Sequence, residues 1–385
     1  MAKPTGARCN LACDYCFFLD KDRLYPGSDF RMTEATMEAF IRQTVEGQTA
    51  PEVTIAWQGG EPTLMGIDFF RRAVEVSKAL EGPGRRVGHS FQTNGFLVDE
   101  AWCRFFRDNG FLVGLSLDGP RELHDAYRHD KAGRSVFDRV EQAARLMQRQ
   151  GVEFNVLCTV NAVNSRRPLE VYRYFRDELG ARYVQFIPIV ERANAAGDQE
   201  GILVTDRTVE PAQYGRFLIE IFDEWVRRDV GRIFVPFFDA VLASYYFGTS
   251  SVCVLRPACG DALALEHNGD LYSCDHFVEP AHRLGNINET PVAELVASEE
   301  QQAFGRAKSE TLPAYCRGCA YLFTCHGECP KNRLLTTPDG EPGLNWLCAG
   351  LKAFFRHADR PMRTMADLLR RGRPADGVMK ALAVE

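Results

Sequence analysis

Three cysteines crowd the N-terminal end of the chain, in the segment "ARCNLACDYCFF". Cys9, Cys13 and Cys16 follow a C-x3-C-x2-C spacing. Three thiols cannot pair off as disulfides, and a structural zinc site takes four protein ligands, although no fourth Cys or His lies nearby. Three thiolates on a short loop instead suit a four-iron, four-sulfur cluster with one iron left open to an exogenous ligand. The spacing therefore predicts a reactive iron–sulfur centre.

A second group of cysteines lies much further along the chain, and its densest part is "CRGCAYLFTCHGEC". The group comprises eight residues: Cys253, Cys259, Cys274, Cys316, Cys319, Cys325, Cys329 and Cys348. Eight thiols divide into two sets of four, which suits two zinc sites or two four-iron clusters, and spacing alone does not assign the members. Cys103 and Cys158 lie in a helix-like and a strand-like segment, so we expect them to be buried apolar residues.

Composition narrows the class of protein. The chain has 385 residues, a length that is enough for two or three domains. Of these residues 45% are hydrophobic. Its net charge of −6 without a long basic run argues against nucleic acid as a partner. No apolar run is long enough to span a membrane, and the N-terminus lacks the apolar core of a secretory signal. We expect a cytoplasmic protein whose 13 cysteines, an odd number, serve as thiols or metal ligands.

Helix-like and strand-like segments alternate up to about residue 190. Apolar spacing predicts helices over 33–48, 66–80, 99–110, 135–151 and 168–180. Short runs rich in β-formers predict strands over 52–57, 88–94, 110–119, 153–161 and 182–190. Repeated β-α units imply a parallel sheet, either doubly wound or a full or partial barrel, with ligands at the carboxyl ends of the strands. The polar segments "QGGEP", "QTNG" and "SLDGP" fall at these ends.

The same pattern predicts three regions: 1–190 as the β/α unit, 191–250 as a linker with a helix over 211–228, and 251–385 as the cysteine-rich region. The last region ends in an amphipathic helix over 346–372, which we expect to be interrupted at Pro361. Since only eight residues precede Cys9, the first strand must be very short, within "AKPTG".

Taken together, these motifs resemble a known family. C-x3-C-x2-C, with an aromatic residue before the last Cys, and "GGEP" resemble the radical S-adenosylmethionine (SAM) enzymes, and the eight-cysteine region resembles their SPASM extension. "KPTGARCNLACDYCFF", "WQGGEPTLMG", "EFNVLCTVN", "QFIPIVER" and "CHGECPKNR" look like the anaerobic sulfatase-maturating enzymes over nearly the whole chain. The resemblance implies an α/β fold: a partial (β/α)6 TIM-like radical SAM barrel and a C-terminal Cys-rich SPASM domain holding two auxiliary iron–sulfur clusters.

The resemblance also implies a reaction. Such enzymes oxidise a Cys or Ser in a Cys/Ser-x-Pro/Ala-x-Arg motif of a sulfatase to Cα-formylglycine without oxygen. One electron from the N-terminal cluster cleaves SAM, and the 5′-deoxyadenosyl radical removes a hydrogen from the substrate Cβ. A general base and an electron outlet must then complete the oxidation. The implied partners are an unfolded sulfatase segment and an external electron donor such as flavodoxin or ferredoxin.

By resemblance, the general base is Asp275 in "SCDHF", with His276 and His267 as competing bases. One auxiliary [4Fe-4S] cluster would use Cys253, Cys259, Cys274 and Cys329, and the other Cys316, Cys319, Cys325 and Cys348, giving three clusters in all. The positions that match SAM contacts are Tyr15, Gly59, Gly60, Glu61, Ser116, Arg128 and Val190. Gln58 is a further expected substrate contact. Taken singly, Ser116 and Arg128 are better explained by a helix cap and a surface ion pair.

Two rival interpretations stay open at this point. A radical SAM/SPASM enzyme can instead form a crosslink in a ribosomally made peptide, although the eight residues before Cys9 leave no room for a leader-binding domain. A zinc-ribbon or ferredoxin-like interaction protein would explain the cysteines alone, but it leaves the three-Cys loop and "GGEP" without a role.

Overall fold

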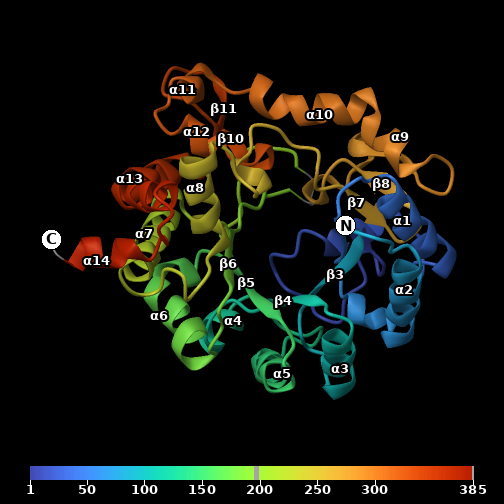
Figure 1. Cartoon of the computed structure of the whole chain (residues 1–385). Coiled ribbons are helices and arrows are strands. Elements are labelled where there is room, and N and C mark those ends of the chain that lie inside the picture. The colour runs from blue at the N-terminus through green and yellow to red at the C-terminus, as the bar shows by residue number, and fades with distance from the viewer. Residues whose placement is uncertain (195–198, 384–385) are drawn as a thin grey trace.

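The computed structural model describes residues 1–194 and 199–383, which surround a curved nine-stranded sheet (Figure 1). Six parallel strands stand side by side in chain order. They are β1 (Ala2–Lys3), β2 (Glu52–Trp57), β3 (Arg86–Thr93), β4 (Leu112–Ser116), β5 (Phe154–Val160) and β6 (Val184–Pro188). This sequential order is that of a partial β/α barrel and excludes the doubly wound alternative. The predicted barrel and its very short first strand are confirmed.

Amphipathic helices cover the outer face of this sheet (Figure 1). They are α1 (Glu34–Glu46), α2 (Ile67–Ala79), α3 (Glu100–Asp108), α4 (Arg121–His124), α5 (Phe137–Gln150) and α6 (Pro168–Arg173). Their apolar stripes meet the β-branched and aromatic residues of the strands, which is why the helices form on this face. Trp57 of β2, for example, packs edge-on against Phe69 and Phe70 of α2, with ring centroids 6.1 and 5.4 Å away.

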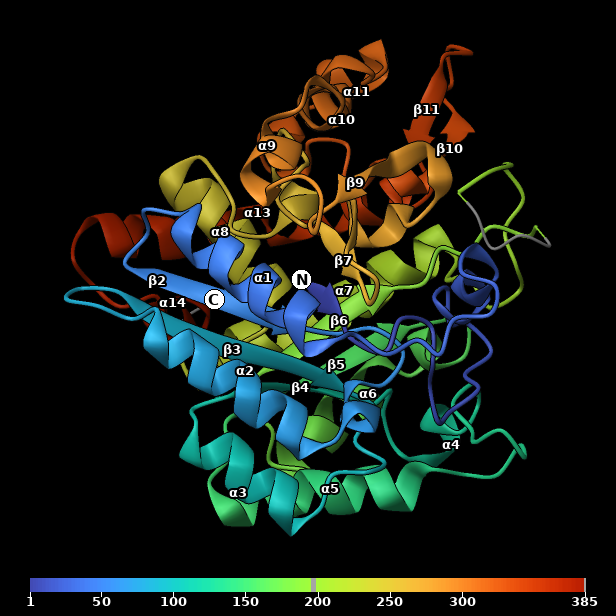
Figure 2. The ribbon, with the colours of Figure 1, turned by 90° about the vertical axis from the view of Figure 1, so that its right-hand side faces the viewer.

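The cysteine-rich region continues the same sheet (Figure 2). Strand β7 (Ala264–Glu266) pairs in parallel with β1, and β8 (Asp270–Tyr272) and β9 (Arg283–Asn286) follow antiparallel. Beyond them lie α9 (Val292–Ala297), α10 (Glu299–Glu310), α11 (Ala314–Arg317), α12 (Leu322–Cys325) and the hairpin β10 (Arg333–Thr336) and β11 (Pro342–Asn345). Helix α10, "EEQQAFGRAKSE", has too few apolar residues for its period to be read from the sequence. Strand β1 is therefore the seam between the two regions.

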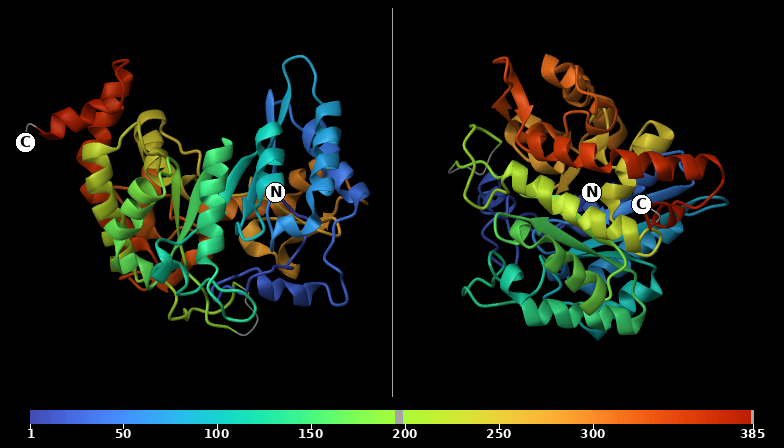
Figure 3. Two further views of the ribbon diagram at one scale, coloured as in Figure 1. Left: turned by 90° about the horizontal axis from the view of Figure 1, so that it is seen from below. Right: turned by 90° about the vertical axis from the view of Figure 1, so that its left-hand side faces the viewer.

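Four further helices lie beside the β6 end of the sheet, where Figure 3 shows α13 lying beside α7 and α8. They are α7 (Pro211–Arg228), α8 (Pro236–Phe247), α13 (Cys348–Arg370) and α14 (Gly377–Ala383). Helices α7 and α13 approach closely because both carry glycine at the crossing: a Cβ on Gly350 would lie 1.9 Å from the Pro211 carbonyl oxygen.

The predicted interruption at Pro361 is wrong, because α13 continues through it to Arg370. Proline inside a helix removes one N–H donor and costs about 3 kcal/mol. Buried residues on both sides of Pro361, among them Phe354 and Met365, hold α13 against the neighbouring helices and offset that cost. No helix among residues 1–194 and 199–383 is long and apolar enough to cross a membrane.

Candidate active site

The three N-terminal cysteines lie on the loop that leaves β1 at the carboxyl edge of the sheet. The loop is held by backbone bonds to the segment after α4, from Ala12 N to His129 O (3.0 Å) and from Asp14 N to Tyr127 O (3.0 Å). The Cys9 sulfur accepts from Leu11 N at 3.4 Å and from the Asn94 side-chain amide at 3.6 Å. The loop is thus fixed on both sides, and its thiols lie where a barrel places its ligands.

The chemistry of these thiols fits an iron–sulfur cluster. Burial raises the pKa of Cys9 to about 12 and that of Cys13 to about 11, and burial also raises the pKa of Cys16. Buried thiolates of this kind need a cationic partner, and soft sulfur donors suit iron. In the described ranges, no group of three His, Cys, Asp or Glu side chains is arranged to hold a single metal ion.

The "GGEP" segment follows β2 and is clamped to the chain just before Cys9. Gly60 N donates to Gly6 O (2.8 Å), and Glu61 N donates to Arg8 O (3.0 Å). A Cβ on Gly60 would lie 2.0 Å from the Arg8 carbonyl oxygen, and Gly59 has a φ of +131° that favours glycine. Both glycines are therefore needed structurally, because they allow the "GGEP" segment to contact the chain just before Cys9.

Glu61 is completely buried and accepts four hydrogen bonds. Its two oxygens receive the Thr63 amide and hydroxyl (3.0 and 2.7 Å), the Thr93 hydroxyl (2.9 Å) and the Asn94 amide (2.8 Å). Glu61 thus connects the loop after β2 to the loop after β3. Asn94 extends this connection to the cysteine loop, because its side-chain amide donates to the Cys9 sulfur. The geometry gives Glu61 a positioning role beside the predicted SAM site.

Arg128 forms the centre of a buried network under the cysteine loop. Its Nε and Nη2 donate to the two oxygens of Asp118 at 2.8 and 3.3 Å. Tyr15 donates its hydroxyl to the same carboxylate, and Thr159 donates to it from both its amide (2.9 Å) and its hydroxyl (2.7 Å). Burial is the largest influence on Asp118 and alone would raise its pKa, but the charge and hydrogen bonds of Arg128, with His124 and Tyr15, together hold that pKa below its ordinary value. The Arg128 guanidinium, which we expected to bind the carboxylate of SAM, thus already binds the carboxylate of Asp118.

Two other predicted SAM contacts lie at strand ends nearby. The Ser116 hydroxyl, at the end of β4, accepts from the Gln92 side-chain amide at 2.9 Å. Val190 is buried just after β6, and its carbonyl accepts from Lys331 Nζ at 3.1 Å. Both positions lie on the same edge of the sheet as the cysteine loop, and their contact with SAM stays a prediction.

The eight downstream cysteines fall into two neighbourhoods. Thiolate charges at Cys253 and Cys259 act on Cys274, and the charge at Cys274 acts in turn on Cys329. Separately, charges at Cys316 and Cys319 act on Cys348, and those at Cys348 and Cys316 act on Cys325. Burial is the largest cause of the raised pKa of all four of these responding thiols, and the pKa of Cys274 and of Cys325 is about 12. The grouping is the one that the family resemblance implies, and ligation itself stays a prediction.

A left-handed turn separates the neighbouring cysteines that belong to different groups. Between Cys325 and Cys329, the φ angles of His326, Gly327 and Glu328 are 47°, 74° and 51°. Two non-glycine residues in this region cost about 1 kcal/mol or more each. This reversal of the chain directs Cys325 and Cys329 toward the two different predicted ligand sets, which explains why the strained turn lies between them.

Asp275 lies at the seam between the two regions. Its carboxylate pairs with the ammonium group of Lys3, on β1, and accepts from the Gln58 side-chain amide at 3.4 Å. Burial is the largest influence on Asp275 and by itself would raise its pKa, but the charge and hydrogen bond of Lys3, the charge of His276 and that of the N-terminal amine together lower that pKa. The Asp275 side chain is 13% exposed and follows Cys274 directly; its ionised form can accept a proton, and its pairing with Lys3 makes it a weaker base than a free carboxylate.

The competing bases are placed less favourably. Burial, together with the charge of Lys331, lowers the pKa of His276 to about 4, and the ring packs on Phe17 with centroids 5.1 Å apart. His267 is buried and hydrogen-bonded on both sides, to the Ser28 hydroxyl (2.6 Å) and to Glu266 (3.1 Å). Cys103 and Cys158 are fully buried, as predicted.

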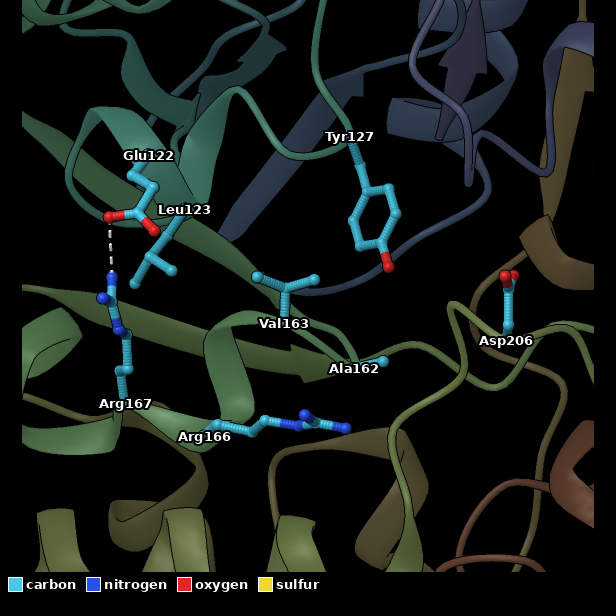
Figure 4. Close-up of a pocket in the computed structure, with 8 residues that line it drawn as sticks. All are labelled: Glu122, Leu123, Tyr127, Ala162, Val163, Arg166, Arg167 and Asp206. Atoms are coloured by element: carbon cyan, nitrogen blue, oxygen red, sulfur yellow. Dashed lines mark hydrogen bonds and ion pairs between the residues drawn. The ribbon is translucent and has the colours of Figure 1, made fainter.

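A separate cavity of about 410 Å³ opens beside the cysteine loop (Figure 4). Glu122 and Leu123 come from α4, Tyr127 from the loop after it, and the opposite wall from the segment after β5, which includes Val163 and Arg166. No predicted cluster or SAM residue lines it. The main chain of Tyr127 nevertheless supports the cysteine loop, so this cavity adjoins the site without being part of it.

Sequence reasoning missed several residues that hold the site together. They are Lys3, Asn94, Asp118, Thr159, Lys308 and Arg333. Asp118 lies in "SLDGP" and Asn94 in "QTNG", so the polar segments after strands did carry a signal. Lys3, Thr159 and Arg333 lie in the quoted segments "KPTGARCNLACDYCFF", "EFNVLCTVN" and "CHGECPKNR", whereas Lys308 lies in none of them, and only packing reveals the contacts of these four residues.

Comparison with known proteins identifies the family of this chain. The radical SAM superfamily matches residues 4–174, and the SPASM iron–sulfur cluster-binding domain matches residues 253–320. The chain is thus a radical SAM enzyme with a SPASM domain, which overturns the zinc-ribbon interpretation.

Similar proteins narrow the assignment. The chain is 44% identical to a serine-type anaerobic sulfatase-maturating enzyme of Bacteroides thetaiotaomicron, covering 99% of this chain and 94% of the relative. It is 32% identical to a cysteine-type enzyme of Clostridium perfringens, covering 93% and 95%. The chain belongs to the anaerobic sulfatase-maturating enzymes.

Solved structures agree with this assignment. Native anSMEcpe with bound AdoMet and Cp18Cys peptide superposes with a TM-score of 0.85 at 32% identity, covering 96% of this chain and 98% of that chain. Streptococcus suis SuiB bound to precursor peptide SuiA has a TM-score of 0.63 at 15% identity, covering 90% and 74%. The second likeness shows a shared fold alone.

Proposed function

We propose that this enzyme oxidises a Cys or Ser of a sulfatase segment to Cα-formylglycine, with Asp275 as the general base. The observation that carries the proposal is the ionised Asp275 carboxylate, directly after Cys274 and held by Lys3 and Gln58. The identity to serine-type relatives is higher than to cysteine-type ones, so we include Ser among the residues it oxidises.

Each group of residues has its own role in the proposed reaction. Cys9, Cys13 and Cys16 would hold the SAM cluster, which supplies an electron for the cleavage of SAM to the 5′-deoxyadenosyl radical. After a hydrogen atom leaves the substrate Cβ, Asp275 accepts the proton of the substrate thiol or hydroxyl. A cluster held by the auxiliary cysteines would accept the second electron, and the substrate would become a thioaldehyde, which water hydrolyses, or an aldehyde. Gln58 orients the Asp275 carboxylate.

The remaining partners belong to the same proposal. A sulfatase segment in unfolded form supplies the substrate, and an external carrier such as flavodoxin or ferredoxin supplies the first electron. We place the enzyme in the cytoplasm, since a reducing compartment keeps its thiols free for iron. Two auxiliary clusters, in addition to the SAM cluster, would occupy the two sets of four cysteines.

An anaerobic assay tests this function. Reconstituted, reduced enzyme is incubated with SAM and two matched sulfatase-type peptides, one with Cys and one with Ser at the target position. We expect an aldehyde on one or both peptides by mass spectrometry. If SAM is cleaved and both peptides stay unchanged, the proposed substrate is wrong, and a crosslink in a ribosomally made peptide becomes the better interpretation.

A further inference from the structure

Two cations lie among the auxiliary cysteines, of which Lys308 is buried and Arg333 is partly buried. Lys308, in the last turn of α10, has a 1% exposed side chain whose ammonium group donates to the carbonyls of Cys253 (2.7 Å) and Val254 (3.0 Å). Burying a charge is costly unless something compensates it. The two carbonyls compensate only in part, so an anion in the neighbourhood is expected.

Arg333, at the start of β10, continues this chain of contacts. Its guanidinium donates to Lys308 O at 2.7 Å and to the carbonyls of His326 (3.3 Å) and Gly327 (3.4 Å). A Cβ on Gly327 would lie 2.8 Å from Arg333 Nη2, so the guanidinium lies directly over the left-handed turn. Arg333 therefore ties the segment that holds Cys253 to the turn that separates Cys325 from Cys329.

The two cations face different cysteines. Lys308 donates to the Cys253 carbonyl and so lies against the first set. Arg333 donates to the carbonyls of His326 and Gly327, which lie between Cys325 of the second set and Cys329 of the first. Glu328 is the opposing buried anion, and its carboxylate is held by the side-chain amides of Asn332 (2.9 Å) and Asn345 (2.7 Å).

We propose that Lys308 and Arg333 are positioning residues that set the relative reduction potentials of the two auxiliary clusters, with Arg333 acting on both and Lys308 on the first alone. The inference rests on the proposed assignment of two clusters to these cysteines. Reduction adds one negative charge to a cluster, and a nearby cation in a poorly solvated site stabilises that charge and raises the potential.

The consequence concerns the direction of electron flow. Lys308 and Arg333 both lie against the set that contains Cys274, which adjoins the proposed base. The second set shares only Arg333 of the two. On the charges of these two residues, a cluster held by the first set would be the easier of the two to reduce and so the better electron acceptor.

A redox titration of the reconstituted holoenzyme, followed by electron paramagnetic resonance, tests this inference. The signal that changes when SAM is added belongs to the N-terminal cluster and is set aside. We expect Lys308→Gln to lower the potential of one auxiliary cluster by at least about 59 mV, a tenfold change in the one-electron equilibrium, and to leave the other unchanged. Arg333→Gln lowers both, whereas Arg333→Lys, which retains the charge, stays near the wild-type values.

Arg306→Gln is the matched control, because Arg306 lies on α10 two residues before Lys308 but its side chain is 49% exposed and pairs with Glu299, so solvent screens its charge. It should move neither potential. Iron and sulfide content is measured for every variant, and if Arg333→Gln loses iron, Lys308→Gln decides. Unchanged potentials in iron-replete variants, or an equal shift of both clusters by Lys308→Gln, would overturn the inference. A wild-type enzyme without two auxiliary signals would overturn the cluster assignment and this inference with it, a result distinct from unchanged potentials.

Discussion

Lys3 and Asp275 form a buried ion pair across the seam between the barrel and the cysteine-rich region. Lys3 belongs to β1 and Asp275 follows Cys274, so the pair joins the first strand to the auxiliary-cluster region. Strand β1 also pairs with both β2 and β7. The proposed base is consequently placed by the strand that leads into the SAM cluster loop.

The first prediction separates the base from its partner. Asp275→Asn should abolish aldehyde formation and leave SAM cleavage intact, because only the proton acceptor is lost. Lys3→Met leaves a buried carboxylate unpaired and should lower the free energy of unfolding by about 3 kcal/mol. Arg71→Met removes an exposed pair with Asp68 and serves as the control, with an expected change below about 0.5 kcal/mol. Product formation by Asp275→Asn at the wild-type rate would refute the role of Asp275.

The second prediction concerns the network under the cysteine loop. Arg128→Gln leaves the Asp118 carboxylate buried without its charged partner, and unfolding should become easier by about 3–5 kcal/mol. Thermal denaturation measures this effect. Arg121→Gln is the control, since Arg121 pairs with Asp138 at the surface. Equal stability of the two variants would contradict a structural role for the Arg128–Asp118 pair.

A third prediction follows from the contact between "GGEP" and the cysteine loop. A methyl group at Gly60 would overlap the Arg8 carbonyl, so Gly60→Ala should displace the loop and cost about 2 kcal/mol. Iron at the N-terminal site and SAM cleavage should both fall. Gly82→Ala, where no atom lies within 4 Å of the added Cβ, should leave iron content and cleavage unchanged. Normal SAM cleavage by Gly60→Ala would show that the contact is dispensable.

Cluster content provides the fourth prediction. Cys348→Ala should remove about one third of the iron, as expected for one of three four-iron clusters, and SAM cleavage should persist. Cys103→Ala replaces a fully buried thiol outside both sets and should retain all the iron. Iron and sulfide analysis of the two reconstituted variants measures the difference. Full iron content in Cys348→Ala would remove Cys348 from the ligands.

The fifth prediction concerns pH and a residue outside the site. Burial raises the pKa of Asp239, on α8, from 3.8 to about 6. The folded state thus binds this proton more tightly than the unfolded state, so stability is fully present below about pH 4 and is lost as pH rises through about 6. Asp239→Asn should therefore raise the free energy of unfolding by about 2 kcal/mol at about pH 8, and by less at about pH 5.

Urea denaturation at the two pH values measures this difference, and Asp339→Asn, at an exposed position, should show no pH-dependent gain. A gain for Asp239→Asn that is the same at both pH values would mean that the carboxylate is already ionised without penalty in the folded state.

Local patterns predicted much of this protein. The spacing of Cys9, Cys13 and Cys16 indicated an open cluster because three ligands within one loop need no tertiary information. The strand over 52–57 and the helix over 211–228 match β2 and α7, since the period of apolar residues reflects which face is buried. The proposed boundaries after 190 and 250 stay a prediction, and the pairing of β7 with β1 shows that the sheet continues across the two regions.

Tertiary structure decided the rest. That Lys3 meets Asp275, that Arg128 forks onto Asp118, and that Arg333 lies over the turn between Cys325 and Cys329 are contacts between segments that only folding brings together. Pro361 stays inside a helix because packing on both sides outweighs its local preference. Sequence spacing determined which chemistry the thiols can do, because donor types and short loops are local properties. The charges that tune that chemistry depend on burial, which only the folded chain possesses.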